Sequence, residues 1–247
     1  GARGADRAVL FFLIGPVSFF FATIYSEATF VFCAVASLLA ARKQRWMLAG
    51  VCGALAALTR SVGVLLIVPL ALEYVQSRPS RQAWRSPHTW LGLAPCMLPV
   101  AGLLAYMAYL GWRFDEPAAY FVSQRHGGHG YSYITDTFIS RHFDGLSTFH
   151  RWWFGGAVVV GLALLLSGSL LRLPLSLTAF ALACCVLYFS IKTLECMPRY
   201  LSVVFPFYCT LGLIGVRWPV AGTALLGLSA ALAMMSVTLF VNGYWFT

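Results

Sequence analysis

Long apolar segments follow one another along almost the whole chain, and this pattern constrains the fold more than any motif does. The segments run approximately over residues 8–24, 26–41, 46–59, 61–77, 89–111, 152–171, 174–191, 200–216 and 218–240. Only 10% of the 247 residues are charged, whereas soluble domains carry about 25%. We therefore predict an all-α, polytopic transmembrane helix bundle that forms one domain over residues 1–247.

Several of these segments are shorter than the roughly 20 residues that a full span needs. We interpret 46–59 and 61–77 as the two arms of a hairpin with Thr59-Arg60 at its tip. Gly15-Pro16 interrupts the first segment, which predicts a helix followed by a short surface element. Small residues recur at every fourth position in the first arm, a pattern typical of close helix packing: Ala49, Gly53 and Ala57.

The basic residues predict the orientation of the spans, because cytoplasmic loops collect Lys and Arg. If Arg3 lies inside and the segments alternate, the basic clusters at 42–45 and 78–85 also lie inside. The 112–151 loop then lies outside, and it is the only large hydrophilic segment. This distribution explains the net charge of +9 without a nucleic-acid partner, and we predict none.

Three charged residues on the predicted outer side have more than one interpretation. Glu27 is either a helix cap after Ser26 at the membrane interface or a polar group that faces a cavity. Arg60 snorkels to lipid, binds a phosphate or pairs with Glu27. Arg199 is either an interfacial anchor beside Tyr200 or a cationic contact to a lipid-linked phosphate.

The outer loop is rich in histidine, but its spacing does not favour a metal site. His126 and His129 flank a Gly-Gly pair, while His142 and His150 follow at loose intervals. The chain has no phosphate-binding Gly-rich loop, no nucleophile elbow and no zinc-protease motif. We therefore predict neither a metal nor a cofactor.

Three stretches together resemble the family of GPI mannosyltransferase 2 and its bacterial relatives. The first is GPVSFFFATIYSEATF, in which Tyr25, Ser26 and Glu27 match the family's Y-S-E. The second is WMLAGVCGALAALTRSVGVLLIVPLALEY, with its T-R-S-x-G around Arg60. The third is MPRYLSVVFPFY, which contains Arg199 and Tyr200. Weaker similarities are EPAAYFVSQ, where Gln124 fits a family glutamine, and the terminal NGYW.

The resemblance implies an inverting membrane mannosyltransferase of the C superfamily of glycosyltransferases (GT-C). Its donor is polyprenyl- or dolichyl-phosphate-mannose, and its acceptor is a glycolipid or glycan. The implied substrate-binding residues are Tyr25, Arg60, Gln124, Arg199 and Tyr200, with Glu27 in a supporting role. In this superfamily the general base is an acid in the first outer loop, so we expect it upstream of residue 1, in a chain truncated at its N-terminus. The expected location is a bacterial inner membrane, or the endoplasmic reticulum membrane in a eukaryote.

Two alternatives remain open from the sequence. A transporter or flippase for a lipid-linked saccharide would use the same cations without cleaving a bond. A noncatalytic membrane subunit is the other possibility, and the sequence does not identify a protein partner. If the enzyme interpretation is right, Arg60→Ala is expected to lose mannosyl transfer while keeping the fold.

Overall fold

The computed structural model describes residues 2–78, 86–126, 148–191, 194 and 196–244, apart from the side chains of 124–126. These residues form helices joined by turns, and no β-strand occurs within the described ranges. Among the described residues, three helical stretches are long and apolar enough to cross a membrane: Pro87–Phe114, Thr148–Leu170 and Pro219–Val241. The prediction of an all-α membrane helix bundle is confirmed, and the chain is an integral membrane protein.

The chain divides into two compact units. Unit 1 comprises Gly1–Tyr25, Gly128–Pro174 and Cys184–Thr247. Unit 2 comprises Ser26–Gly127 and Leu175–Ala183. The arrangement as one transmembrane domain stays a prediction, and each unit is described separately below.

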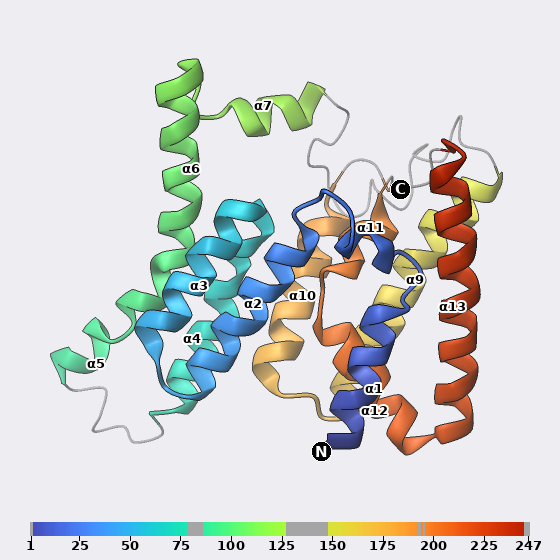
Figure 1. Ribbon diagram of the computed structural model, residues 1–247. Helices are drawn as coiled ribbons and strands as arrows, with labels where there is room; N and C mark the ends of the chain where they lie inside the picture. The colour runs from blue at the N-terminus through green and yellow to red at the C-terminus, as the bar shows by residue number, and fades with distance from the viewer. Residues whose placement is uncertain (1, 79–85, 127–147, 192–193, 195, 245–247) are drawn as a thin grey trace. The chain divides into compact units, whose positions relative to one another are not determined.

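Unit 2 is built around the predicted hairpin. Its helices are α2 (Glu27–Arg42), α3 (Trp46–Thr59), the 3₁₀ helix η2 (Ser61–Leu66), α4 (Ile67–Gln76), α5 (Pro87–Leu91), the 3₁₀ helix η4 (Ala94–Met97), α6 (Leu98–Phe114), α7 (Ala119–His126) and the start of α10 (Leu175–Phe189). Helix α3 packs against both α2 and α6, while η2 folds back onto α3 (Figure 1). The hairpin prediction is confirmed, with Arg60 between its two arms.

Small residues allow the helices of unit 2 to approach closely. A side-chain carbon added at Gly53 would lie 2.8 Å from Cγ of Pro99 in α6. One added at Gly102 would lie 2.4 Å from the carbonyl oxygen of Ala54 in α3. Ala49, Gly53 and Ala57 are all buried, which confirms that this every-fourth-residue face packs.

Unit 1 contains the two ends of the chain. Its helices are α1 (Ala2–Leu13), the 3₁₀ helix η1 (Ser18–Phe21), α9 (Thr148–Leu170), the end of α10, α11 (Met197–Ser202), α12 (Pro206–Arg217) and α13 (Pro219–Val241). Helix α12 packs against α1, α9 and α13. The break between α1 and η1 confirms the interruption predicted at Gly15-Pro16.

Two predicted segments are not continuous helices. Residues 200–216 divide between α11 and α12, and Pro206 stands in the first turn of α12. Residues 89–111 divide among α5, η4 and α6, where Pro95 and Pro99 occupy first-turn positions. Proline fits the first turn of a helix but breaks its interior, so apolar runs with internal prolines become shorter helices.

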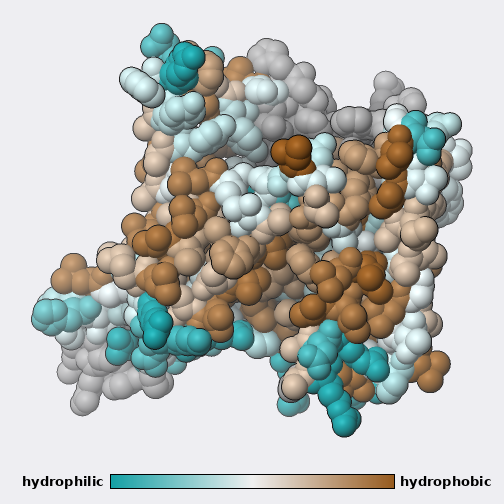
Figure 2. Space-filling view, in the orientation of Figure 1, coloured by the Kyte–Doolittle hydropathy of each residue, from teal (hydrophilic) through white to brown (hydrophobic). Residues whose placement is uncertain are grey.

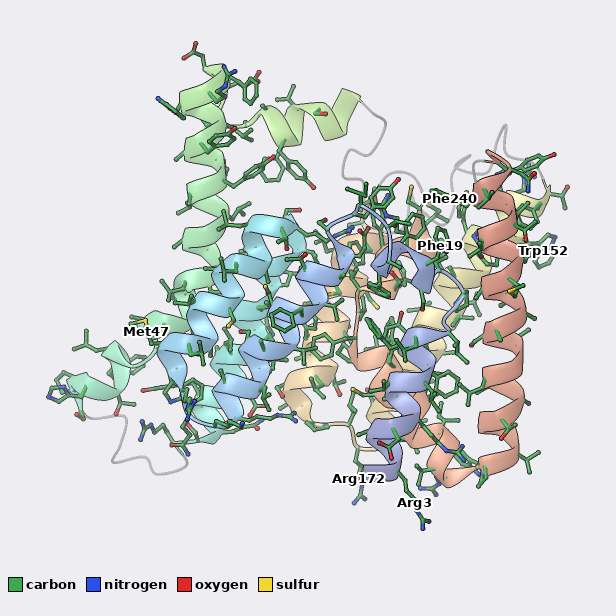
Figure 3. The ribbon with its side chains drawn as sticks, in the orientation of Figure 1. Arg3, Phe19, Met47, Trp152, Arg172 and Phe240 are labelled. Atoms are coloured by element: carbon green, nitrogen blue, oxygen red, sulfur yellow. The ribbon has the colours of Figure 1, made fainter. Side chains whose placement is uncertain are left out.

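Charged residues gather at helix ends, as the orientation argument requires. In unit 2, Nε of Arg42 lies 3.2 Å from Oε1 of Glu73, so α2 and α4 end side by side. In unit 1, Arg3 and Arg172 lie at one end, while Phe19, Trp152 and Phe240 lie toward the other (Figure 3). Figure 2 shows hydrophilic residues at the ends of the helices and hydrophobic ones along their sides. Which end is cytoplasmic stays a prediction.

Candidate functional site

Glu27 and Arg60 form a buried ion pair in unit 2. Nη1 of Arg60 donates a hydrogen bond to Oε1 of Glu27 at 2.5 Å. The Glu27 side chain is 0% exposed and that of Arg60 is 13% exposed. Ser26 stands at the N-cap position of α2, but its side chain makes no capping hydrogen bond. Of the alternatives open from the sequence, pairing with Glu27 is the one that the structure shows for Arg60, and Glu27 is not an exposed cap.

The turn that holds Arg60 follows from the local sequence TRSVG. The Arg60 backbone is extended, with φ −149° and ψ 134°, and the Arg60 N–H donates to the carbonyl of Ala56 at 3.0 Å. The Arg60 carbonyl accepts the N–H of Gly63 at 2.8 Å. A side-chain carbon at Gly63 would lie 2.4 Å from the backbone nitrogen of Ala57. Only glycine lets η2 lie this close to α3, and this contact fixes the position of Arg60.

The residue after Arg60 joins the hairpin tip to the start of the predicted outer loop. Oγ of Ser61 and Oη of Tyr120 lie 3.1 Å apart in a hydrogen bond. Tyr120 belongs to α7, and its ring makes an edge contact with Tyr106 of α6. Gln124 follows one turn later in α7, but its side chain lies outside the described residues. The site predicted from sequence lacked Ser61 and Tyr120, although each stands within a stretch that carries the resemblance.

Arg199 lies in unit 1 against aromatic rings. Its guanidinium carbon is 4.1 Å from the ring centroid of Tyr25 and 4.9 Å from that of Phe20. Cation–π contacts of this kind contribute about 0.5–2 kcal/mol. Tyr200 instead stacks on Tyr188, with ring centroids 5.2 Å apart and planes at 12°. The structure therefore joins Arg199 with Tyr25 and places Tyr200 in a separate aromatic pair.

Four of the predicted site residues thus fall into two clusters, with Glu27 and Arg60 in unit 2 and Tyr25 and Arg199 in unit 1. The hairpin-tip cluster of unit 2 comprises Glu27, Arg60, Ser61 and Tyr120. The Arg199 cluster of unit 1 comprises Phe20, Tyr25 and Arg199. Each cluster combines a cation with an aromatic side chain, which suits a ligand that carries both phosphate and sugar. From the sequence we also expected Glu27, Arg60 and Arg199 to converge on one outward-opening cavity, and this stays a prediction.

Of the histidines considered for a metal site, His150 is described with its side chain and His126 without it. His129 and His142 lie outside the described residues. Within the part of the chain that the structure describes, no group of three or more His, Cys, Asp or Glu side chains could hold a metal ion.

Residues 1–106 match the family model of dolichyl-phosphate-mannose-protein mannosyltransferase. The match covers less than half of the 247 residues, and it contains Tyr25, Glu27 and Arg60 but not Arg199. No curated protein and no solved structure matches the chain significantly. The comparisons therefore support a resemblance to membrane mannosyltransferases that use a lipid-linked donor, and they do not single out GPI mannosyltransferase 2.

Proposed function

We propose that the protein is a membrane mannosyltransferase of GT-C type that transfers mannose from a polyprenyl- or dolichyl-phosphate carrier to a glycolipid or glycan. The observation that carries this proposal is the family match over residues 1–106. The matched region also contains the buried Glu27–Arg60 pair. The family match lends no support to a flippase.

The reaction itself explains why fixed cations are needed. The acceptor oxygen forms a bond to the anomeric carbon of mannose, while the bond from that carbon to the phosphate oxygen breaks. The electron pair of the broken bond stays on the phosphate, and the acceptor proton passes to a general base. Negative charge therefore grows on the phosphate, and a preorganised cation stabilises the transition state more than the ground state.

Arg199 is the side chain best suited to meet this charge. It is half-buried, and the rings of Tyr25 and Phe20 hold its guanidinium group in place. A guanidinium binds phosphate through two parallel hydrogen bonds. Tyr25, whose ring adjoins Arg199, and Tyr200, which pairs with Tyr188, are proposed to contact the sugar face, which apolar ring surfaces suit.

Arg60 and Glu27 have a different place in the proposal. The Glu27 carboxylate is fully buried and holds Arg60, so it supports that arginine and is not the group that takes the acceptor proton. Arg60 and Gln124 are proposed as further donor or acceptor contacts, since the hairpin tip and α7 meet at the Ser61–Tyr120 hydrogen bond. We assign the general base to none of these residues.

The test is transfer of labelled mannose from polyprenyl-phosphate-mannose in native membranes, normalised to folded protein. Arg199→Gln is expected to lower turnover by about 100–1,000-fold, the usual effect of removing one preorganised donor. Arg113→Gln is the matched control, because Arg113 also lies over an aromatic ring, Phe114, but is exposed. Wild-type turnover in Arg199→Gln would remove Arg199 from the site. Failure of the wild type to release polyprenyl phosphate would overturn the enzyme proposal.

A further inference from the structure

Unit 1 contains an apolar groove of about 380 Å³, bounded by α9, α11, α12 and α13. We name it the α9–α13 groove. Leu225, Leu228 and Leu232 line it from α13, and their spacing places them on one face of that helix. Gly156 and Val160 line it from α9, again one turn apart.

The side chains that line the groove favour a hydrocarbon ligand. Among the described residues that line it, none is charged, and most are aliphatic or aromatic. Helices α9 and α13 are two of the three stretches long and apolar enough to span a membrane. A roomy apolar site holds an apolar ligand in preference to water, because water there finds too few polar partners.

Several residues that line the groove are close neighbours in the chain of the Arg199 cluster. Pro198 and Ser202 line the groove, and they flank Arg199 in α11. Oγ of Ser202 donates a hydrogen bond to the Arg199 carbonyl at 2.7 Å. The groove is also lined by Val17, which directly precedes η1, the element that carries Phe20 against Arg199. The groove is therefore bordered by chain segments next to both partners of the Arg199–Phe20 contact.

We propose that the α9–α13 groove holds the first part of the polyprenyl chain of the donor, with its phosphate at Arg199. This inference rests on the proposed function. An apolar cavity of about 150 Å³ binds benzene, which has six carbons, so a groove of this size accommodates about 15 carbons. That is about three isoprene units of a single chain. The two acyl chains of a phospholipid would not fit side by side.

Gly156 leaves open space in the groove next to its backbone. A side-chain carbon added there would meet no other atom within 4 Å, although Gly156 lines the groove. A larger side chain can therefore enter the groove without moving the backbone. Gly227 in α13 has the same open surroundings but does not line the groove, so it provides a matched control. Both substitutions replace a helical glycine and are expected to favour the helix.

The experiment measures lipid binding to the full chain in nanodiscs, with no sugar on the probe. A diazirine-bearing farnesyl phosphate of 15 carbons is crosslinked by light, and the modified peptides are identified by mass spectrometry. We expect crosslinks to α9 and α13 in the wild type. Unlabelled prenyl phosphates of 15 carbons or more should compete well, while a five-carbon prenyl phosphate and phosphatidic acid should compete poorly.

Gly156→Leu is expected to weaken farnesyl phosphate binding at least tenfold, because each buried CH₂ group contributes about fourfold in affinity. Gly227→Leu should bind as the wild type does. Wild-type binding by Gly156→Leu, no binding by the wild type, or equal competition by phosphatidic acid would each overturn the groove assignment. Binding with the expected pattern but without mannosyl transfer would uphold the groove and refute the proposed function. Transfer that is unaffected by Gly156→Leu would uphold the proposed function and refute the groove assignment.

Discussion

Breaking the Glu27–Arg60 pair is predicted to cost the protein much of its stability. Arg60→Met would leave the carboxylate of Glu27, which is 0% exposed, without its cation. Two unit charges about 4 Å apart interact by about 4 kcal/mol at an effective dielectric constant near 20. Removing one partner of a buried pair typically costs about 3–5 kcal/mol, which agrees. For a chain of this size, 4 kcal/mol corresponds to a fall in the melting temperature of about 8–16 °C.

The double variant separates the charge interaction from simple loss of packing. Glu27→Leu together with Arg60→Met removes both charges, and apolar replacement of a buried pair is often close to neutral. The double variant should therefore lose much less stability, measured from its melting temperature in detergent, than Glu27→Leu and Arg60→Met lose when their separate effects are added. If the single effects add to within about 0.5 kcal/mol, the two side chains do not interact and the reasoning is wrong.

This result would also change what Arg60→Ala can show about catalysis. From the sequence we expected that variant to lose transfer while keeping the fold. Because the structure places a fully buried carboxylate against Arg60, loss of the fold is now the more direct consequence. Turnover must therefore be measured per folded molecule, and Arg60→Lys is the better probe, since an ammonium keeps the charge but not the planar fork of donors.

Three further predictions concern other parts of unit 2. Gly63→Ala should lower stability by about 1–3 kcal/mol in a detergent melting assay, because the added carbon would lie 2.4 Å from the α3 backbone and must displace η2. Ser176→Ala should cost about 1.5–3 kcal/mol in the same assay, since the Ser176 hydroxyl donates to Oε1 of Glu73 at 2.5 Å; no change would show that this bond does not hold α10. In intact cells, a cysteine placed at Lys43 should be protected from an impermeant thiol reagent and one placed at Asp115 should be labelled, while the opposite pattern would invert the predicted topology.

The sequence by itself determined the elements of the fold. The apolar runs located nearly all the described helices, and Gly15-Pro16 marked the first break. The hairpin was predictable because its signals are local: two short apolar arms and a polar tip between them. The divided segments were the exception. Hydrophobicity continues through Pro95 and Pro206, whereas new helices begin there. The apolar pattern therefore missed breaks that the prolines indicate.

Only the tertiary structure decided which side chains meet. Glu27 and Arg60 are 33 positions apart, and the sequence left a lipid contact, a phosphate contact and their pairing open. The pairing depends on where the start of α2 and the end of α3 lie after the two helices pack, which small residues such as Gly53 determine through distances that no local pattern encodes. The same holds for Arg199 over Tyr25, since α11 and the segment before α2 are brought together by folding alone. Hydrophobicity along the chain locates the helices, but the burial and the partner of each charged side chain follow from three-dimensional packing.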